Sequence, residues 1–216
     1  MAERPAFFND HGRVVGKSYS FEWFPGFAVS QKQKSADSLH AAVRRADPAA
    51  RPLEISSKSR NPVGVKLSAF NLRLDGHTLE NIFQSAKVFK HGGPYTDLLE
   101  VSPKEAKRDQ RLQSSGALQA FRYQGEDFPL VPKSAFYDYL YIRAVKESLT
   151  AEEMKTVLQY DYFTDIEFNP KKSINCQAKS AAVIKALLLE YGELPDIQKN
   201  RKEYEQFYKS IGADCV

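Results

Sequence analysis

A carboxylic acid, an amide and an amine follow one another at helical spacing in residues 77–89 of this sequence. Glu80, Gln84 and Lys87 lie three or four residues apart, which places them on one stripe of a helix. Beside this stripe, apolar residues recur with the same period: Leu79, Ile82, Phe83, Ala86 and Phe89. We therefore expect a single helix over this segment, which the glycines and proline at 92–94 bring to an end.

Two interpretations of this stripe follow from the pattern. A carboxylate and an amine beside aromatic surface are suited to acid/base chemistry, because partial burial and neighbouring charge both shift a pKa. Acidic and basic side chains at this spacing also occur on ordinary solvent-exposed helix faces. Glu80, Gln84 and Lys87 are therefore candidate site residues. Whether they perform acid/base chemistry or form a solvent-exposed helix face depends on how deeply the folded chain buries them.

Motifs of the common nucleotide and metal sites are absent. The sequence has no Gly-x-Gly-x-x-Gly, no Walker-type Gly-Lys-Ser/Thr, no Gly-x-Ser-x-Gly and no His-Glu-x-x-His. The histidines at 11, 40, 77 and 91 have no ligand spacing, nor do Cys176 and Cys215. We expect no metal and no cofactor, so the chemistry falls to a carboxylate or a lysine.

Length and composition agree with an ordinary globular protein. The 216 residues suffice for one domain with its own core. The net charge of +4 permits a polyanionic partner without indicating one. The longest apolar run, at 186–189, is too short to cross a bilayer, and the first residues resemble neither a signal peptide nor an anchor. We expect a cytoplasmic protein.

The order of the predicted elements indicates the fold class. Residues 6–29 are rich in aromatics and glycines, which predicts short strands, and residues 53–56 alternate like another strand. Helices are predicted over residues 37–45, 102–112, 133–147, 150–160, 177–191 and 195–210. With strands early and helices late, we expect an α+β, predominantly helical fold with a small N-terminal β-rich part.

Three polar segments could meet phosphate groups. The loop at 57–62 carries hydroxyls and cations, although it is equally typical of a solvated connection. Asn175 precedes the predicted helix 177–191, and free backbone N–H groups at such a helix end favour anions. A basic face on the helix 102–112 is either solvated or follows a nucleic-acid backbone: Lys104, Lys107, Arg108 and Arg111.

Two segments of the chain resemble the NADAR or YbiA-like family. Leu67-Ser68-Ala69-Phe70, followed by residues 75–89, is similar to its Leu-Ser-x-Phe segment, Gly, and Thr/Ser-x-Glu-x-x-Phe-Gln-x-x-Lys-x-Phe helix. The run from Ser102 to Arg108 is similar to its second signature, Pro-Lys-Glu-Ala-Lys. The resemblance covers residues 65–191. It implies a YbiA-like single domain in which residues 1–64 form a β-rich extension packed on a catalytic core of residues 65–216.

Departures from typical YbiA-like members narrow the resemblance. The chain has residues 162–168 where those members have Trp-Gly-x-Gly, and it has a long N-terminal extension. This combination resembles the branch found beside DarT toxins, which are DNA-targeting mono-ADP-ribosyltransferases. Members of that branch are antitoxins that remove ADP-ribose from guanine bases in DNA. The resemblance implies an ADP-ribosyl glycohydrolase whose functional partner is a DarT-type toxin.

The sequence leaves two alternative functions open. One is a YbiA-like N-glycosidase acting on riboflavin-pathway intermediates. The other is a non-catalytic module that binds ADP-ribose or nucleic acid.

The implied reaction suggests roles for individual residues. Cleavage of a glycosylamine passes through an oxocarbenium-like species, which Glu80 would stabilise while it activates water, or through an imine. In the second route Lys87, with Lys58 behind it, would form a Schiff base. Asp165 is a further catalytic candidate that contacts ribose or assists proton transfer. The predicted substrate-binding residues are Phe83, Gln84, Lys58, Ser57 and Asn175, with Gln84 orienting the sugar and the last three holding the diphosphate.

Overall fold

The computed structural model describes residues 1–171, 173–199 and 201–213. Its backbone contacts divide the chain into two compact units. The larger unit contains residues 1–68 and the chain from residue 149 onward, and the smaller unit contains residues 69–148. Cys215 lies outside the described residues. Each unit is described by itself.

A mixed sheet with the strand order β2-β1-β9-β3 forms the centre of the larger unit. β1 (Ala2–Asp10) and β2 (Arg13–Phe21) form an antiparallel hairpin, and both residues of its turn, His11 and Gly12, have positive φ. β9 (Tyr162–Thr164) pairs antiparallel with β1 and parallel with β3 (Pro52–Glu54). Strands that are far apart in the sequence, such as β1 and β9, therefore pair in one sheet.

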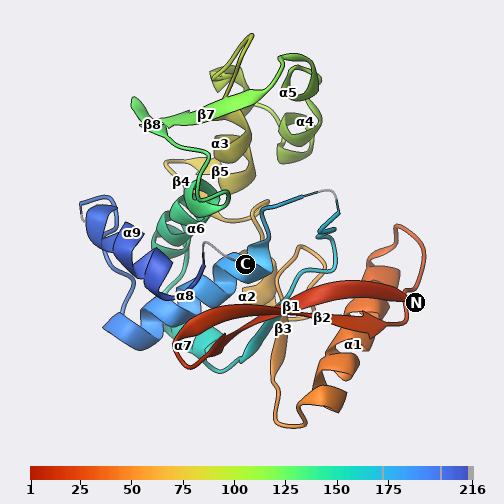
Figure 1. The fold of residues 1–216 in the computed structure, drawn as a ribbon. Helices are drawn as coiled ribbons and strands as arrows, with labels where there is room; N and C mark the ends of the chain where they lie inside the picture. The colour runs from red at the N-terminus through yellow and green to blue at the C-terminus, as the bar shows by residue number, and fades with distance from the viewer. Residues whose placement is uncertain (172, 200, 214–216) are drawn as a thin grey trace. The chain divides into compact units, whose positions relative to one another are not determined.

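Helices cover the two faces of this sheet. Because strand side chains alternate, Ala6 of β1 points to the face covered by α1 (Val29–Ala46), where it joins a core cluster with Leu39. Asn9 points to the other face and donates a hydrogen bond to a backbone carbonyl of α8 (Gln177–Tyr191) at 3.2 Å. Figure 1 shows α8 beside β1 and α1 beside β2. Further helices of this unit are α2 (Pro62–Lys66), α7 (Ala151–Leu158) and α9 (Arg201–Ser210).

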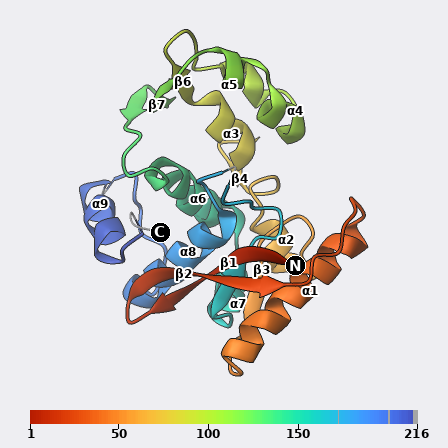
Figure 2. The same ribbon diagram turned by 45° about the vertical axis from the view of Figure 1, so that its right-hand side comes forward.

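The smaller unit packs short helices against a sheet with the strand order β6-β7-β8. Its aromatic core joins α3, the sheet and α6, with the ring of Phe83 5.3 Å from that of Phe121 and 5.1 Å from that of Tyr137. Figure 2 shows α3 beside α4 in this unit. In chain order the elements are β4 (Arg73–Leu74), β5 (His77–Thr78), α3 (Leu79–Ser85), β6 (Lys87–Phe89), η1 (Thr96–Leu99), α4 (Pro103–Arg108), α5 (Arg111–Ser114), β7 (Leu118–Tyr123), β8 (Glu126–Phe128) and α6 (Ala135–Ser148).

The predicted α+β class is confirmed, and several predicted helices are observed with close boundaries. α8 spans residues 177–191 as predicted and ends at Gly192, whose φ of 75° is left-handed. α7 begins at a capping box between Thr150 and Glu153. The start of α7 depends on hydrogen bonds within its first turn, and the end of α8 depends on a glycine that adopts a positive φ. Both can be predicted from residue types a few positions apart.

The predicted helix over residues 77–89 is wrong in its second half. α3 ends at Ser85, and Lys87 begins the strand β6. Lys87 pairs with Phe121 of β7, and the N–H of Arg122 donates to the carbonyl of Ala86 at 2.7 Å. Pairing with a strand more than thirty positions away along the chain thus overrides a local helical pattern.

Other helix boundaries also differ from the prediction. The helix predicted over 37–45 begins at Val29, and Asp37, the first residue of the predicted helix, lies within α1 and pairs with Arg60. The helix predicted over 102–112 divides into α4 and α5, because the Asp109 carboxylate accepts a hydrogen bond from the N–H of Arg111 at 2.8 Å and begins a new turn. The helix predicted from 195 begins at residue 201.

The strands are spread from Ala2 to Thr164, so the expected N-terminal β-rich part and the predominance of helix are not confirmed. Residues 1–64 contain the long helix α1, and β9 lies near residue 163. The division into a 1–64 extension and a 65–216 core stays a prediction, because such a boundary is drawn between relatives and not from contacts within one chain. No helix in the described part of the chain has the length and apolar character needed to cross a membrane.

Candidate functional site

Glu80 lies in the first turn of α3, where local hydrogen bonds start the helix. The Thr78 side chain accepts a hydrogen bond from the N–H of Asn81 at 3.2 Å and caps α3. The N–H of Glu80 donates to the carbonyl of Ala69 at 3.0 Å. Glu80 is only 5% exposed. The acid of the predicted stripe is therefore buried, unlike a side chain on a solvated helix face.

Gln84 connects this acid to the amine. Its Nε2 donates to Oε1 of Glu80 at 2.9 Å, and its Oε1 accepts from Nζ of Lys87 at 2.7 Å. We call Glu80, Gln84 and Lys87 the Glu80 row. The row exists although the helix ends before Lys87, because the Lys87 side chain on β6 reaches back to Gln84.

The amine of Lys87 is held in a largely apolar setting. Its Nζ lies 4.9 Å from the centroid of the Phe83 ring. Burial lowers the pKa of Lys87 to about 8, with attraction to Glu80 acting against this shift and repulsion from Lys107 adding to it. More of this amine is neutral near pH 7 than in an exposed lysine, and the neutral form is the nucleophile.

Lys107 is a further cation at this site. Its Nζ lies 3.6 Å from Oε1 of Glu80, so the carboxylate has an ammonium partner as well as the Gln84 amide. In the sequence, Lys107 belongs to a basic helix face and to the run that resembles the second family signature, and neither pattern indicates a contact with Glu80. The contact depends on α4 packing beside α3, for which the sequence has no periodic signal.

Phe83, a predicted substrate-binding residue, lies in the aromatic core. It is 6% exposed, and its ring contacts those of Phe121, Phe136 and Tyr137. Each such aromatic pair contributes roughly 0.5–1.5 kcal/mol beyond area burial. The same ring also lies against the Lys87 amine, so Phe83 contributes to the surroundings of that amine.

Asp165, the further predicted catalytic residue, directly follows β9 in the larger unit. Its Oδ1 accepts from the N–H groups of Glu167 and Phe168 at 3.0 and 3.1 Å, and its Oδ2 accepts from Nε2 of Gln177 at 2.9 Å. Burial raises the pKa of Asp165 to about 6, although these hydrogen bonds act to lower it. A carboxyl group that titrates near neutral pH can both accept and deliver a proton.

Glu54 is a buried carboxyl group that sequence reasoning missed. Its Oε1 accepts from the N–H of Ile166 at 2.8 Å, and its Oε2 accepts from the Thr164 hydroxyl at 2.7 Å. Burial, and after it the charge of Asp165, raise the pKa of Glu54 to about 8. In the sequence, Glu54 is one polar position of a short strand. The parallel pairing of β3 with β9, which sets Glu54 opposite Thr164, has no local signal.

His40 extends this group from α1. Its Nε2 lies 2.8 Å from the Thr164 hydroxyl, which in turn contacts Glu54. Burial lowers the pKa of His40 to about 4, so the ring is neutral at physiological pH. A histidine, a hydroxyl and a carboxyl group thus form one hydrogen-bonded series inside the larger unit.

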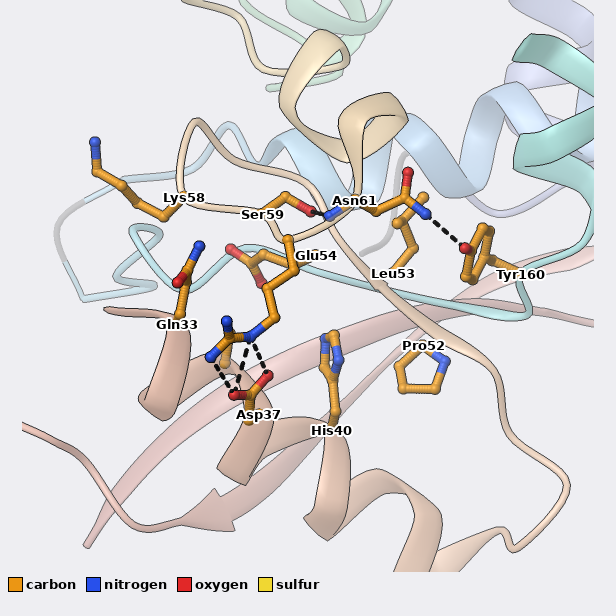
Figure 3. A pocket seen from close by; sticks show the side chains of 12 residues that line it. Gln33, Asp37, His40, Pro52, Leu53, Glu54, Lys58, Ser59, Asn61 and Tyr160 are labelled. Carbon is orange, nitrogen blue, oxygen red and sulfur yellow. Dashed lines mark hydrogen bonds and ion pairs between the residues drawn. The ribbon is translucent and has the colours of Figure 1, made fainter. Parts of the chain in front are cut away.

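A pocket of about 150 Å³ opens beside Glu54 and His40 within the larger unit (Figure 3). Lys58 and Ser59 line it, whereas Ser57 is exposed and does not. The diphosphate role of Lys58 and Ser57 stays a prediction. Arg60, on the same loop, is engaged with Asp37 in an ion pair of 3.0 Å, drawn in Figure 3.

Asn175 lies one residue before Cys176, the N-cap of α8. Its Oδ1 is buried and has no hydrogen-bond partner among the described residues. Cys176 supplies no side-chain cap at this helix end. Neither Asn175 nor Asp165 lines the Lys58 pocket.

The predicted site residues thus fall into two groups. Glu80, Gln84, Lys87 and Phe83 come together in the smaller unit, whereas Asp165, Lys58, Ser57 and Asn175 belong to the larger unit. Across the described residues, no three His, Cys, Asp or Glu side chains are arranged to hold a metal ion. The Glu80 row combines a carboxylate with an amine of lowered pKa, which suits cleavage of a carbon–nitrogen bond.

Comparison with known proteins identifies the family. None of the curated proteins matches the chain significantly. A family model described as DarT1-associated NADAR antitoxin matches residues 2–214. The match includes both units, the Glu80 row and the Lys58 pocket. With nearly its whole length matched, the chain belongs to the family of DarT1-associated NADAR antitoxins.

Proposed function

We propose that this protein is an N-glycosidase that removes ADP-ribose from guanine bases of DNA, reversing the action of a DarT1-type toxin. Membership of the antitoxin family implies such a toxin as its functional partner. We place this repair activity in the cytoplasm. The observation that carries the proposal is the Glu80 row, in which a buried carboxylate is joined through one amide to an amine of lowered pKa.

Glu80 serves the first chemical requirement of this reaction. As the bond between the anomeric carbon and the guanine amine breaks, positive charge develops on the sugar, and a buried carboxylate beside it stabilises that charge. The same carboxylate can accept the proton of the attacking water. Gln84, which holds one Glu80 oxygen, keeps this group in one orientation and meets the sugar hydroxyls.

Lys87 supports a second route through ring opening. The opened glycosylamine is an imine between the anomeric carbon and the guanine nitrogen. The neutral Nζ of Lys87 adds to that carbon, and guanine leaves with a proton on its amine nitrogen. Water then hydrolyses the lysine imine, which releases ADP-ribose and restores the free amine. The lowered pKa of Lys87 and its hydrogen bond to Gln84 of the row support this route.

The larger unit, taken by itself, offers polar groups that suit parts of an ADP-ribose molecule. Lys58 at the pocket and Ser57 on the same loop offer donors for diphosphate oxygens, and the buried amide oxygen of Asn175 can accept from a ribose hydroxyl. Asp165, with its pKa raised to about 6, is suited to assist proton transfer. These roles are part of the proposal.

The test is the conversion of Glu80 to Gln, which preserves shape and the buried position. We expect ADP-ribose release from an ADP-ribosylated guanine oligonucleotide to fall by roughly 10²–10⁴-fold, with an unchanged circular dichroism spectrum. Glu100→Gln, at an exposed acid of the same unit, is the matched control and should retain full activity.

Three results would point elsewhere. Full activity of Glu80→Gln would refute the proposed role of the row. Turnover of a small riboflavin-pathway N-glycoside but not of the oligonucleotide would favour the metabolic relatives. Binding of ADP-ribose without turnover of any glycoside would indicate a non-catalytic module.

A further inference from the structure

Lys107 approaches the Glu80 row from the solvent side. The Lys107 side chain is 56% exposed, whereas that of Glu80 is 6% exposed, and their charged atoms lie 3.6 Å apart. Its Nζ also lies 5.3 Å from the centroid of the Phe70 ring. Oε1 of Glu80 thus has two partners, Gln84 from its own helix and a largely exposed cation from α4.

The position of Lys107 is well defined by α4. Ser102 and Glu105 form a capping box at the start of this helix, and Pro103 occupies its first turn. Ala106, next to Lys107, is fully buried. A helix held at its start and along one side directs Lys107 toward α3, so its contact with Glu80 follows from the fold.

We propose that Lys107 is a positioning residue for the proposed hydrolysis, holding the Glu80 carboxylate from its solvent side while Gln84 holds it from within α3. The inference rests on the proposed function of the row. An ion pair with one buried partner is screened less by water and salt than a pair with both partners exposed. It therefore fixes the carboxylate more firmly than an ordinary surface contact would.

Lys107 also acts on Lys87 through their shared neighbour. The two ammonium groups approach the same Glu80–Gln84 pair, and repulsion between them is one cause of the lowered pKa of Lys87. Removal of the Lys107 charge should therefore raise the Lys87 pKa. Less neutral amine would then be present at pH 7, and the reaction would slow without any loss of folded protein.

Other ionisable groups lie on elements packed against α3. A titration of the Lys87 amine must therefore be distinguished from the titration of these groups. Asp97 pairs with Arg111, and Glu105 belongs to the capping box. The remaining acidic and basic residues on those elements are His77, Lys104, Arg108, Asp138, Arg143, Lys146 and Glu147. A direct signal from the Lys87 side chain separates its titration from theirs.

The experiment compares Lys107→Gln, Lys107→Arg and the control Lys146→Gln, at an exposed lysine of α6. Protein labelled with ¹³C at the lysine ε-carbon is titrated by NMR, and Lys87→Arg identifies the Lys87 signal. We expect Lys107→Gln to raise the Lys87 midpoint by roughly half a unit to one unit. We expect Lys107→Arg and Lys146→Gln to leave it unchanged.

Activity supplies the second readout. Lys107→Gln should lower kcat/KM on the modified oligonucleotide about 3–10-fold at pH 7, and less at pH 9, where about half or more of the Lys87 amine is neutral in either protein. An unchanged Lys87 midpoint in Lys107→Gln, or the same shift in Lys146→Gln, would overturn the inference. Because the NMR titration needs no turnover, it tests Lys107 even if the proposed function fails. A normal midpoint shift in a protein without glycosidase activity would reject the function alone.

Discussion

The smaller and larger units each bury a glutamate, but they surround it differently. Glu80 in the smaller unit has the amide of Gln84 and the ammonium of Lys107 at the same oxygen, Oε1. Glu54 in the larger unit accepts hydrogen bonds from a hydroxyl and a backbone N–H, and its acidic neighbour is Asp165. Burial is similar, at 5% and 3% exposure, so burial alone does not distinguish them.

The neighbours therefore decide what each acid can do. A buried carboxyl group beside another acid keeps its proton to a higher pH, and burial together with Asp165 raises the pKa of Glu54 to about 8. A carboxylate with cationic and amide partners is suited to stabilising positive charge on a substrate. We infer that the smaller unit carries the charge-stabilising carboxylate and the larger unit a proton-holding pair.

The largest expected effect concerns the amine that accompanies Glu80. Lys87→Met and Lys87→Arg should both lower turnover by on the order of 10²-fold or more, because neither side chain can act as a neutral amine near pH 7. Borohydride added during turnover should trap an adduct, and peptide mapping should locate it at Lys87. The exposed neighbour variant Lys90→Arg should retain activity.

The location of the adduct sharpens the comparison between the units. An adduct on Lys58 would assign the reacting amine to the larger unit and reverse our assignment. Trapping of no lysine, combined with loss of activity in Glu80→Gln, would favour the oxocarbenium route.

A second prediction concerns the stability of the proton-holding pair. Raised pKa values in the folded state mean that the pair stabilises the protein at low pH, and that this contribution is lost as pH rises through about 6 for Asp165 and about 8 for Glu54. Glu54→Gln resembles the protonated acid at every pH. Relative to the natural protein, it should gain on the order of 2 kcal/mol between pH 5 and pH 8.

Urea unfolding at the two pH values measures this difference. Glu190→Gln, at an exposed acid near the end of α8, should show no such gain. Equal pH dependence in Glu54→Gln and the natural protein would mean that Glu54 is ionised throughout, which removes the contrast between the units.

The smallest expected effects come from two capping boxes, one in each unit. Ser102→Ala in α4 and Thr150→Ala in α7 should each lower the free energy of unfolding by about 1 kcal/mol, because each removes the acceptor for an N–H at the start of a helix. Only Ser102→Ala should also lower turnover, since α4 carries Lys107. Equal loss of activity in both variants would show that general stability is responsible.

Features that depend on residues close together in the chain could be predicted from the sequence. The ends of α7 and α8 follow from Thr150, Glu153 and Gly192, whose roles involve hydrogen bonds and backbone angles within a few residues. The candidate acid and amine also stood out, because Glu80 and Lys87 have helical spacing beside apolar positions. Their connection through Gln84 was consistent with that spacing, although the sequence overstated the length of the helix.

The fold decided everything that depended on distant partners. β7 turned residues 87–89 into a strand, and the pairing of β3 with β9 made Glu54 a buried neighbour of Asp165. Both pairings join residues far apart in the chain, and no local pattern reports them. The sequence therefore determined which reactive groups this protein possesses and where most helices end. Their charge states and neighbours came from tertiary packing, because burial and the approach of distant charges set the pKa values of Lys87, Glu54 and Asp165.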